Sequence, residues 1–168
     1  VGADPGVPAT TRRYARLQTI RCQLQAGQHA AALASIGAFL EEYPKTPEKG
    51  HVLICQGQAA DATGKADEAE QAFRAAMSFF ADDLENYQIA GEHLVQVLSK
   101  RQKWPAGAAV LRQMSTRVSL TNRADFRLRS AEFEINAGNL AAAQADLRQV
   151  VDEFGLDAAA VRAARGHL

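Results

Sequence analysis

The stretch AGQHAAALA, residues 26–34, returns near the other end of the chain as AGNLAAAQA, residues 137–145, with five alanines and the glycine at matching places. A glycine followed five residues later by alanine also occurs at Gly64, and Gly107 supplies a small residue at the corresponding place in the region between. The small residues are then separated by 37, 38 and 36 residues, at Ala32, Ala69, Gly107 and Ala143. Such regular spacing indicates a repeat array in which one packing requirement recurs, because a second helix that lies close to the first must face small side chains.

Each repeat is predicted to be a pair of α-helices, because apolar residues recur at helical spacing and no segment alternates as a strand does. The first helices are expected at 11–26, 47–62, 84–101 and 123–137, and the second helices at 29–43, 67–80, 105–117 and 140–154. Residues 1–9 are expected to form a flexible N-terminal segment, and residues 157–168 a solitary helix that covers the open end of the last pair. The predicted fold class is therefore all-α.

Residues typical of helix ends stand between these segments. Thr46 before Pro47 predicts an N-cap followed by a first-turn proline, and Asp82 with Glu85 matches a capping box. The turn between paired helices needs a glycine, which adopts a positive φ at little steric cost.

The composition is that of a globular domain, with 47% hydrophobic and 23% charged residues. Nineteen basic and nineteen acidic residues cancel, which argues against a nucleic-acid partner, because phosphate contacts need a positive field. No apolar run approaches the ~20 residues of a membrane-spanning helix. Cys22 and Cys55 are too few for a disulfide scaffold and are expected to be small buried apolar residues, with an inter-helix disulfide as the alternative.

These residues resemble the tetratricopeptide repeat (TPR) family, whose units of about 34 residues place small residues, a turn glycine and a large apolar residue at fixed positions. The repeat at 50–83 fits best, through Gly57, Gly64, Ala69, Phe73 and Ala76, and the other repeats span about 13–46, 88–121 and 124–157. The resemblance covers about 10–168. It implies a TPR-like α-solenoid of four helix-turn-helix repeats with a C-terminal capping helix.

By the same resemblance, the first helices line a concave groove that holds a peptide or a helix of a protein partner. The groove-facing positions implied in this chain are Tyr14, Arg21, His51, Gln58, Ile89, Glu92, Gln96, Asp125, Leu128 and Glu132. Their mixture of polar, aromatic and apolar side chains suits an extended peptide or a partner helix. We therefore expect a non-catalytic interaction scaffold or adaptor.

An alternative hypothesis is a sensor or an enzyme-associated regulatory domain that binds a small molecule or a metal. His51 and Cys55 are four residues apart on one predicted helix, and His93 lies on the first helix of the next repeat. Two ligands at helical spacing arise often by chance, so no metal site and no cofactor is expected. The chain shows no nucleophile motif and no phosphate-binding glycine loop, so no enzyme activity is expected.

The stretch FLEEYPKTP, residues 39–47, is similar to TPR proteins of the bacterial envelope. A periplasmic location, or a lipid anchor through a missing N-terminus, is therefore favoured over the cytoplasm. Because the chain starts at Val1, we also expect it to be a processed or trimmed product. Self-association through the exposed edge of the array is a further hypothesis.

Overall fold

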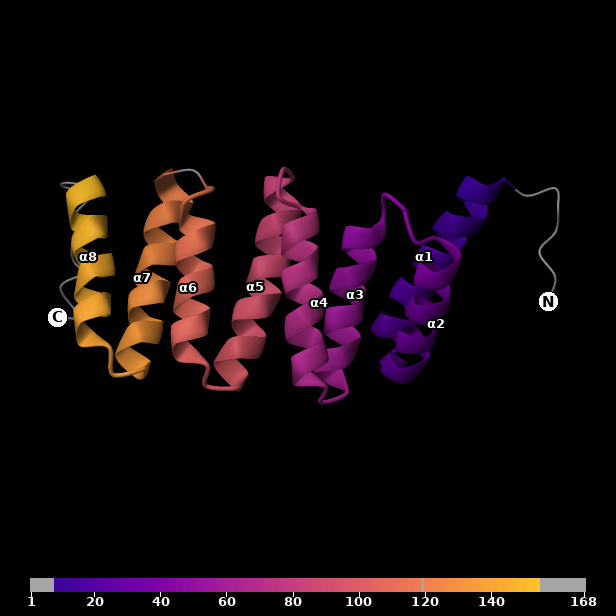
Figure 1. Ribbon diagram of the computed structural model, residues 1–168, viewed down its shortest axis with the longest axis horizontal. Helices are drawn as coiled ribbons and strands as arrows, with labels where there is room; N and C mark the ends of the chain where they lie inside the picture. The colour runs from indigo at the N-terminus through magenta and orange to yellow at the C-terminus, as the bar shows by residue number, and fades with distance from the viewer. Residues whose placement is uncertain (1–7, 119, 155–168) are drawn as a thin grey trace. The chain divides into compact units, whose positions relative to one another are not determined.

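The computed structural model describes residues 8–118 and 120–154, and every regular element within them is an α-helix. In chain order these are α1 (Ala9–Gln25), α2 (His29–Glu42), α3 (Lys49–Ala62), α4 (Ala66–Phe79), α5 (Leu84–Lys100), α6 (Trp104–Ser115), α7 (Leu120–Asn136) and α8 (Leu140–Phe154) (Figure 1). The predicted all-α fold is confirmed. Ala9, which the sequence prediction placed in a flexible N-terminal segment, is the first residue of α1. The expected capping helix at 157–168 lies outside the described residues, as do residues 1–7.

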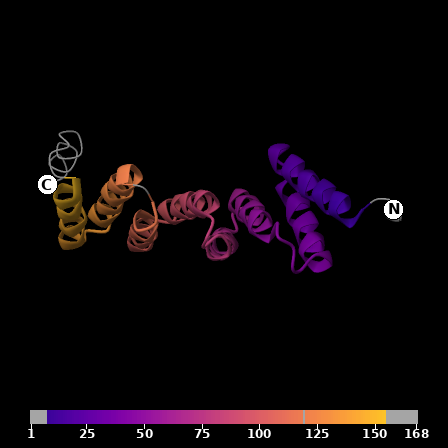
Figure 2. The same ribbon diagram turned by 90° about the horizontal axis from the view of Figure 1, so that it is seen from above.

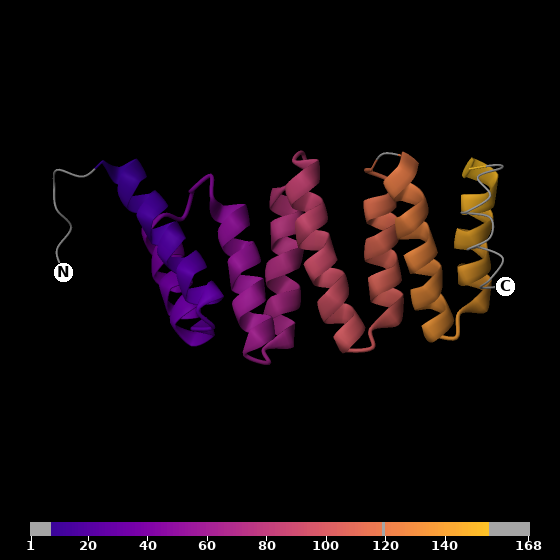
Figure 3. The same cartoon turned by 180° about the vertical axis from the view of Figure 1, so that it is seen from behind.

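The chain divides between Ala81 and Asp82 into two compact units of two helical hairpins each. In the first unit α1 packs against α2, α3 packs against α4, and α3 also contacts both helices of the preceding hairpin (Figure 2). In the second unit α6 contacts α5 and α7, and α7 packs against α8 (Figure 3). The placement of all four repeats in one domain from 10 to 168 stays a prediction.

Both predicted N-caps differ from the observed ones. The helix α3 begins at Lys49, because Thr46 closes a turn of its own, in which its hydroxyl donates to the Glu48 carboxylate and accepts from the Glu48 N–H at 3.4 Å. The N-cap of α5 is Asp83 rather than Asp82. Its carboxylate accepts from the backbone N–H of Asn86 at 3.1 Å and from the Asn86 side-chain amide at 2.7 Å.

The turns inside the hairpins have the backbone conformation expected of glycine. Gly27, Gly64 and Gly138 have φ values of 71°, 77° and 77°. In the third hairpin the corresponding place is taken by Gln102, with a φ of 54°, the one positive φ of a residue other than glycine among the described residues. A side chain in this left-handed region carries a steric cost.

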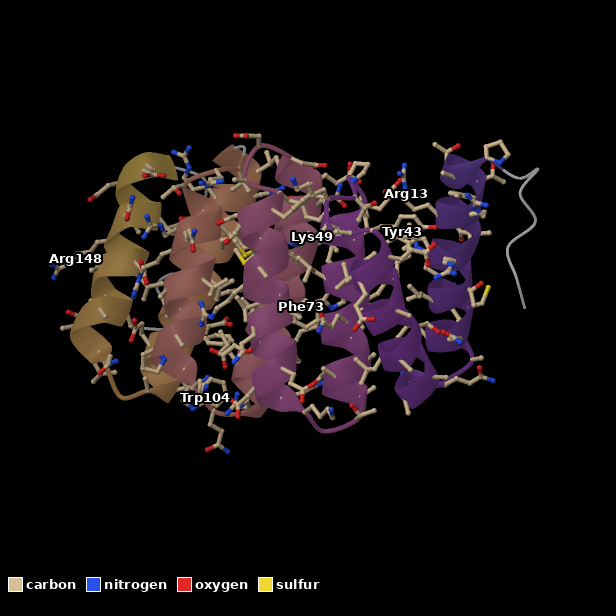
Figure 4. The ribbon with its side chains drawn as sticks, turned by 45° about the vertical axis from the view of Figure 1, so that its right-hand side comes forward. Arg13, Tyr43, Lys49, Phe73, Trp104 and Arg148 are labelled. Atoms are coloured by element: carbon tan, nitrogen blue, oxygen red, sulfur yellow. The ribbon has the colours of Figure 1, made fainter. Side chains whose placement is uncertain are left out.

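Helices approach one another where one of them lacks a side chain. A Cβ atom added at Gly57 of α3 would lie 2.5 Å from the Phe73 ring of α4, whose place within its hairpin is labelled in Figure 4. Gly107 of α6 similarly receives the Phe133 ring of α7, against which Trp104 packs edge-on with ring centroids 5.4 Å apart. The predicted small residues Ala32, Ala69 and Ala143 are buried, which confirms their place in the core.

Replacing Gly57 with alanine is expected to lower the free energy of unfolding by about 1–3 kcal/mol, because the new methyl group collides with Phe73. The same change at Gly37, a helical glycine of α2 with nothing within 4 Å of an added Cβ, should raise it by about 0.5–1 kcal/mol. Urea unfolding of both variants measures the difference. Equal effects would contradict the close approach at Gly57.

Replacing Gln102 with glycine should raise the free energy of unfolding by up to about 1 kcal/mol, since the left-handed conformation then carries no side-chain clash. The control Gln113→Gly removes the same side chain from an exposed position within α6, where glycine costs about 1 kcal/mol. Thermal and urea unfolding give both values. Loss of stability at both positions would show that the turn carries no strain.

Candidate functional site

The ten predicted groove residues all lie on the first helix of a hairpin. Tyr14 and Arg21 lie on α1 and His51 and Gln58 on α3, and we call these four residues the unit-1 face. The six others, on α5 and α7, form the unit-2 face: Ile89, Glu92, Gln96, Asp125, Leu128 and Glu132. None of the ten is fully buried, and the side chains of Tyr14 and Ile89 are 63% and 41% exposed.

The unit-1 face combines a cation with aromatic and amide groups. Arg21 is exposed, and its charge acts on the buried Cys55 thiol of α3, although burial has the larger effect and raises the pKa of that thiol. His51 is half-buried and packs edge-on against Phe80, with ring centroids 5.1 Å apart. His51 therefore packs against an aromatic ring of its own unit.

On the unit-2 face, an arginine that sequence reasoning missed joins two predicted residues from different helices. The guanidinium of Arg129 donates to both carboxylate oxygens of Glu92, at 2.6 and 2.7 Å, and lies 3.6 Å from an oxygen of Asp125. The hydrogen bond to Glu92 raises the pKa of Arg129 against the opposing effect of burial. Arg129 follows Glu92 by 37 residues, about one repeat, which is the signal that links the two in the sequence.

The second unit also holds a buried ionic network between α6, α7 and α8. The Asp146 side chain accepts hydrogen bonds from Arg112 at 2.8–3.1 Å, from Arg127 at 3.0 Å and from the Ser130 hydroxyl at 2.7 Å. Arg112 also pairs with Glu134 at 2.7 Å. Sequence reasoning did not find this network, because its members are scattered over three helices and each looks like an ordinary surface charge.

The network keeps Asp146 ionised although the residue is only 3% exposed. Burial alone would raise the pKa of its carboxyl group, but the hydrogen bonds from Arg112 and Ser130 and the positive charge of Arg112 hold that pKa below its usual value. Beside the network lies a cavity of about 200 Å³ between α6, α7 and α8. It is lined by Ser115, Thr116, Arg123, Arg127, Gln149 and Glu153.

The residues considered as metal ligands are divided between the two units. His51 and Cys55 belong to α3 of the first unit and His93 to α5 of the second. Within the described ranges no group of three or more His, Cys, Asp or Glu side chains is arranged to hold a metal ion. Both cysteines are free thiols, and Cys22 is exposed, which corrects the expectation that both are buried: it lies on the side of α1 away from the packed Leu17 and Ile20.

The fold is similar to that of a solved repeat protein. A crystal structure of nearly identical TPR-like repeats from Podosopora anserina, described as a kinesin light chain, superposes with a TM-score of 0.60 at 17% sequence identity. The match covers 87% of this chain and 76% of that one. The chain therefore has a TPR-like helical repeat fold, as the sequence resemblance implied.

No protein-family model matches the chain, and no curated protein does. The similarity of residues 39–47 to bacterial envelope proteins has no counterpart in these comparisons and stays a prediction. No helix within the described part of the chain has the length and apolar character that crossing a membrane requires.

Asp146→Asn should lower the free energy of unfolding by up to about 3 kcal/mol, because it removes the carboxylate partner of Arg127 and one of the two carboxylate partners of the half-buried Arg112. The folded-state pKa of Asp146 lies below its unfolded value of about 3.9, so its stabilisation is present above that pH and is lost as the pH falls through the folded-state value. The variant should consequently depend less on pH in this acidic range. Denaturant unfolding at a series of pH values measures both effects.

The control for this experiment is Asp152→Asn, which alters an exposed carboxylate of the same helix. It should change the free energy of unfolding by no more than about 0.5 kcal/mol. If the two variants behaved alike, the network around Asp146 would not contribute to stability.

Proposed function

We propose that this protein is a non-catalytic scaffold or adaptor whose first-helix faces bind a peptide or a helix of a protein partner. TPR-like repeats generally mediate protein–protein interactions, and this chain has that fold over 87% of its length. The observation that carries the proposal is the exposure of the two faces. Tyr14 and Ile89 are large apolar side chains left open to solvent on helices whose other sides are packed.

Surfaces that bind protein partners combine aromatic and apolar residues with a surrounding rim of polar ones. On the unit-1 face, Tyr14 is accompanied by the cation of Arg21 and the amide of Gln58, and on the unit-2 face Ile89 is accompanied by carboxylates. Aromatic residues and arginine are enriched among the residues that contribute most to binding at protein interfaces. Tyr14 and Arg21 are therefore the residues of the unit-1 face that we expect to contribute most.

The double variant Arg21→Glu, Gln58→Ala should weaken partner binding, because both side chains belong to the unit-1 face, and its unfolding temperature is measured alongside to confirm that the fold is kept. A loss of at least about ten-fold is expected where a hot-spot arginine is reversed in charge. Immobilised wild-type and variant chains are compared by capture from a native lysate and quantitative mass spectrometry.

The matched control is Arg148→Glu, Gln71→Ala, which makes the same substitutions at exposed positions of the second helices α8 and α4. Arg148 lies on the outer surface of α8 (Figure 4). Proteins lost from the first variant and retained by the control are candidate partners. A partner set that is unchanged in the first variant would place the interaction elsewhere on the molecule.

A further inference from the structure

The cavity between α6, α7 and α8 is lined by two arginines of the same helix. Arg123 and Arg127 are four residues apart on α7, so both side chains leave the helix on one side. The Nε atoms of both residues are buried, and neither has a hydrogen-bond partner within the described part of the chain. A buried donor without a partner carries the full cost of its desolvation, so these two N–H groups favour a ligand that accepts hydrogen bonds.

The other contacts of the two guanidinium groups leave the Nε atoms available. Arg127 donates through Nη1 to Asp146 at 3.0 Å, and this bond holds a guanidinium whose side chain is only 13% exposed. Nη1 of Arg123 lies 3.6 Å from the carboxylate of Glu153, which is longer than a hydrogen bond. Arg127 therefore provides a fixed donor, and Arg123 can turn toward a ligand without breaking a short contact.

The other side chains that line the cavity present hydrogen-bond acceptors. The hydroxyls of Ser115 and Thr116 donate to backbone carbonyls three residues earlier, at 2.7 and 2.8 Å, so their oxygens accept from a ligand. The Glu153 carboxylate accepts from the Gln149 amide at 2.9 Å and adds a negative charge. An anion without a proton is repelled by this carboxylate, whereas an anion that keeps a proton can donate it there.

We propose that this cavity binds an oxyanion that still carries a proton, with hydrogen phosphate as the ion that fits it. Its charged oxygens accept from the Nε atoms of Arg123 and Arg127, and its hydroxyl donates to Glu153. The cavity volume of about 200 Å³ admits such an ion, since one water molecule takes about 30 Å³ in the liquid. None of the ten predicted groove residues, all of which are described, lines the cavity, so the site is separate from the proposed binding faces.

Isothermal titration calorimetry of the full chain tests this site with phosphate and sulfate at equal ionic strength and neutral pH. Sulfate matches phosphate in shape but carries no proton under these conditions. Phosphate is expected to bind once per chain, with an affinity at least about ten-fold higher than that of sulfate, because a charge-assisted hydrogen bond is lost with sulfate. Equal affinities, or no binding of phosphate at millimolar concentrations, would overturn the proposal.

Arg123→Gln should weaken the binding of phosphate by at least about ten-fold, because it removes one of the two cations that contact the ion. The matched control is Arg148→Gln, which removes the same charge from the outer surface of α8 (Figure 4) and should leave the affinity unchanged. Equal weakening in both variants would reduce the effect to overall charge and contradict a site in the cavity.

Glu153→Gln keeps the size of the side chain and removes its charge. Sulfate should then bind at least about three-fold more tightly than to the wild-type chain, because the repulsion by the carboxylate is gone. A gain in binding cannot result from a loss of folding, so this variant tests the site even if Arg123→Gln unfolds. An unchanged preference for phosphate would overturn the part assigned to Glu153.

Methyl phosphate distinguishes the two sources of this chemistry. At about pH 6 a phosphate monoester is roughly half protonated and so presents the same donor and acceptors. Binding as tight as that of inorganic phosphate supports a site for the phosphate group of a larger molecule. Binding of inorganic phosphate alone supports a site for the free ion.

Discussion

The packing of this protein depends on helices that come close together where one of them has no side chain. Phe73 fills the place beside Gly57, Met114 fills the place beside Gly91, and Phe133 fills the place beside Gly107. Each large side chain thereby makes many short-range contacts with backbone, and dispersion attraction is strong only at such short distances. A methyl group at Gly57 or Gly107 would collide with an aromatic ring of the neighbouring helix, whereas at Gly91 the flexible Met114 side chain can move aside. Close helix packing therefore depends most on the glycines that face aromatic rings.

This way of packing leaves one side of every first helix outside the core. In α5 the residues that pack include Leu94, Val95 and Leu98, and the predicted groove residues occupy the least buried side of the same helix. Residues on the open side are not constrained by core packing, and their chemistry can vary while the fold is kept. The contrast between the cation and aromatic groups of the unit-1 face and the carboxylates of the unit-2 face is an instance of this freedom.

The last repeat has a buried charged residue at a position that is apolar in the two repeats before it. Asp146 stands where the preceding repeats have Val110 and Ala72, both buried, and it is held by charged and polar partners from two neighbouring helices. Desolvating these charges is costly, and their mutual attraction and hydrogen bonds offset that cost only when the geometry is good. Because hydrogen bonds depend on direction as well as distance, the network restricts the relative orientation of α6, α7 and α8 more strongly than apolar contacts would.

The sequence by itself determined the all-α class, the helix pairs and the turn glycines, because all of these follow from local spacing and backbone sterics. The third turn was not predicted in this way, because it has no glycine, and only the structure shows that Gln102 takes the positive φ there. Only the tertiary structure decided the start of α3 at Lys49, the exposure of Cys22, the ion pair of Arg129 and the burial of Asp146. These depend on which side chains of different helices meet, and a charge looks the same in a sequence whether its partner is water or a residue one repeat away.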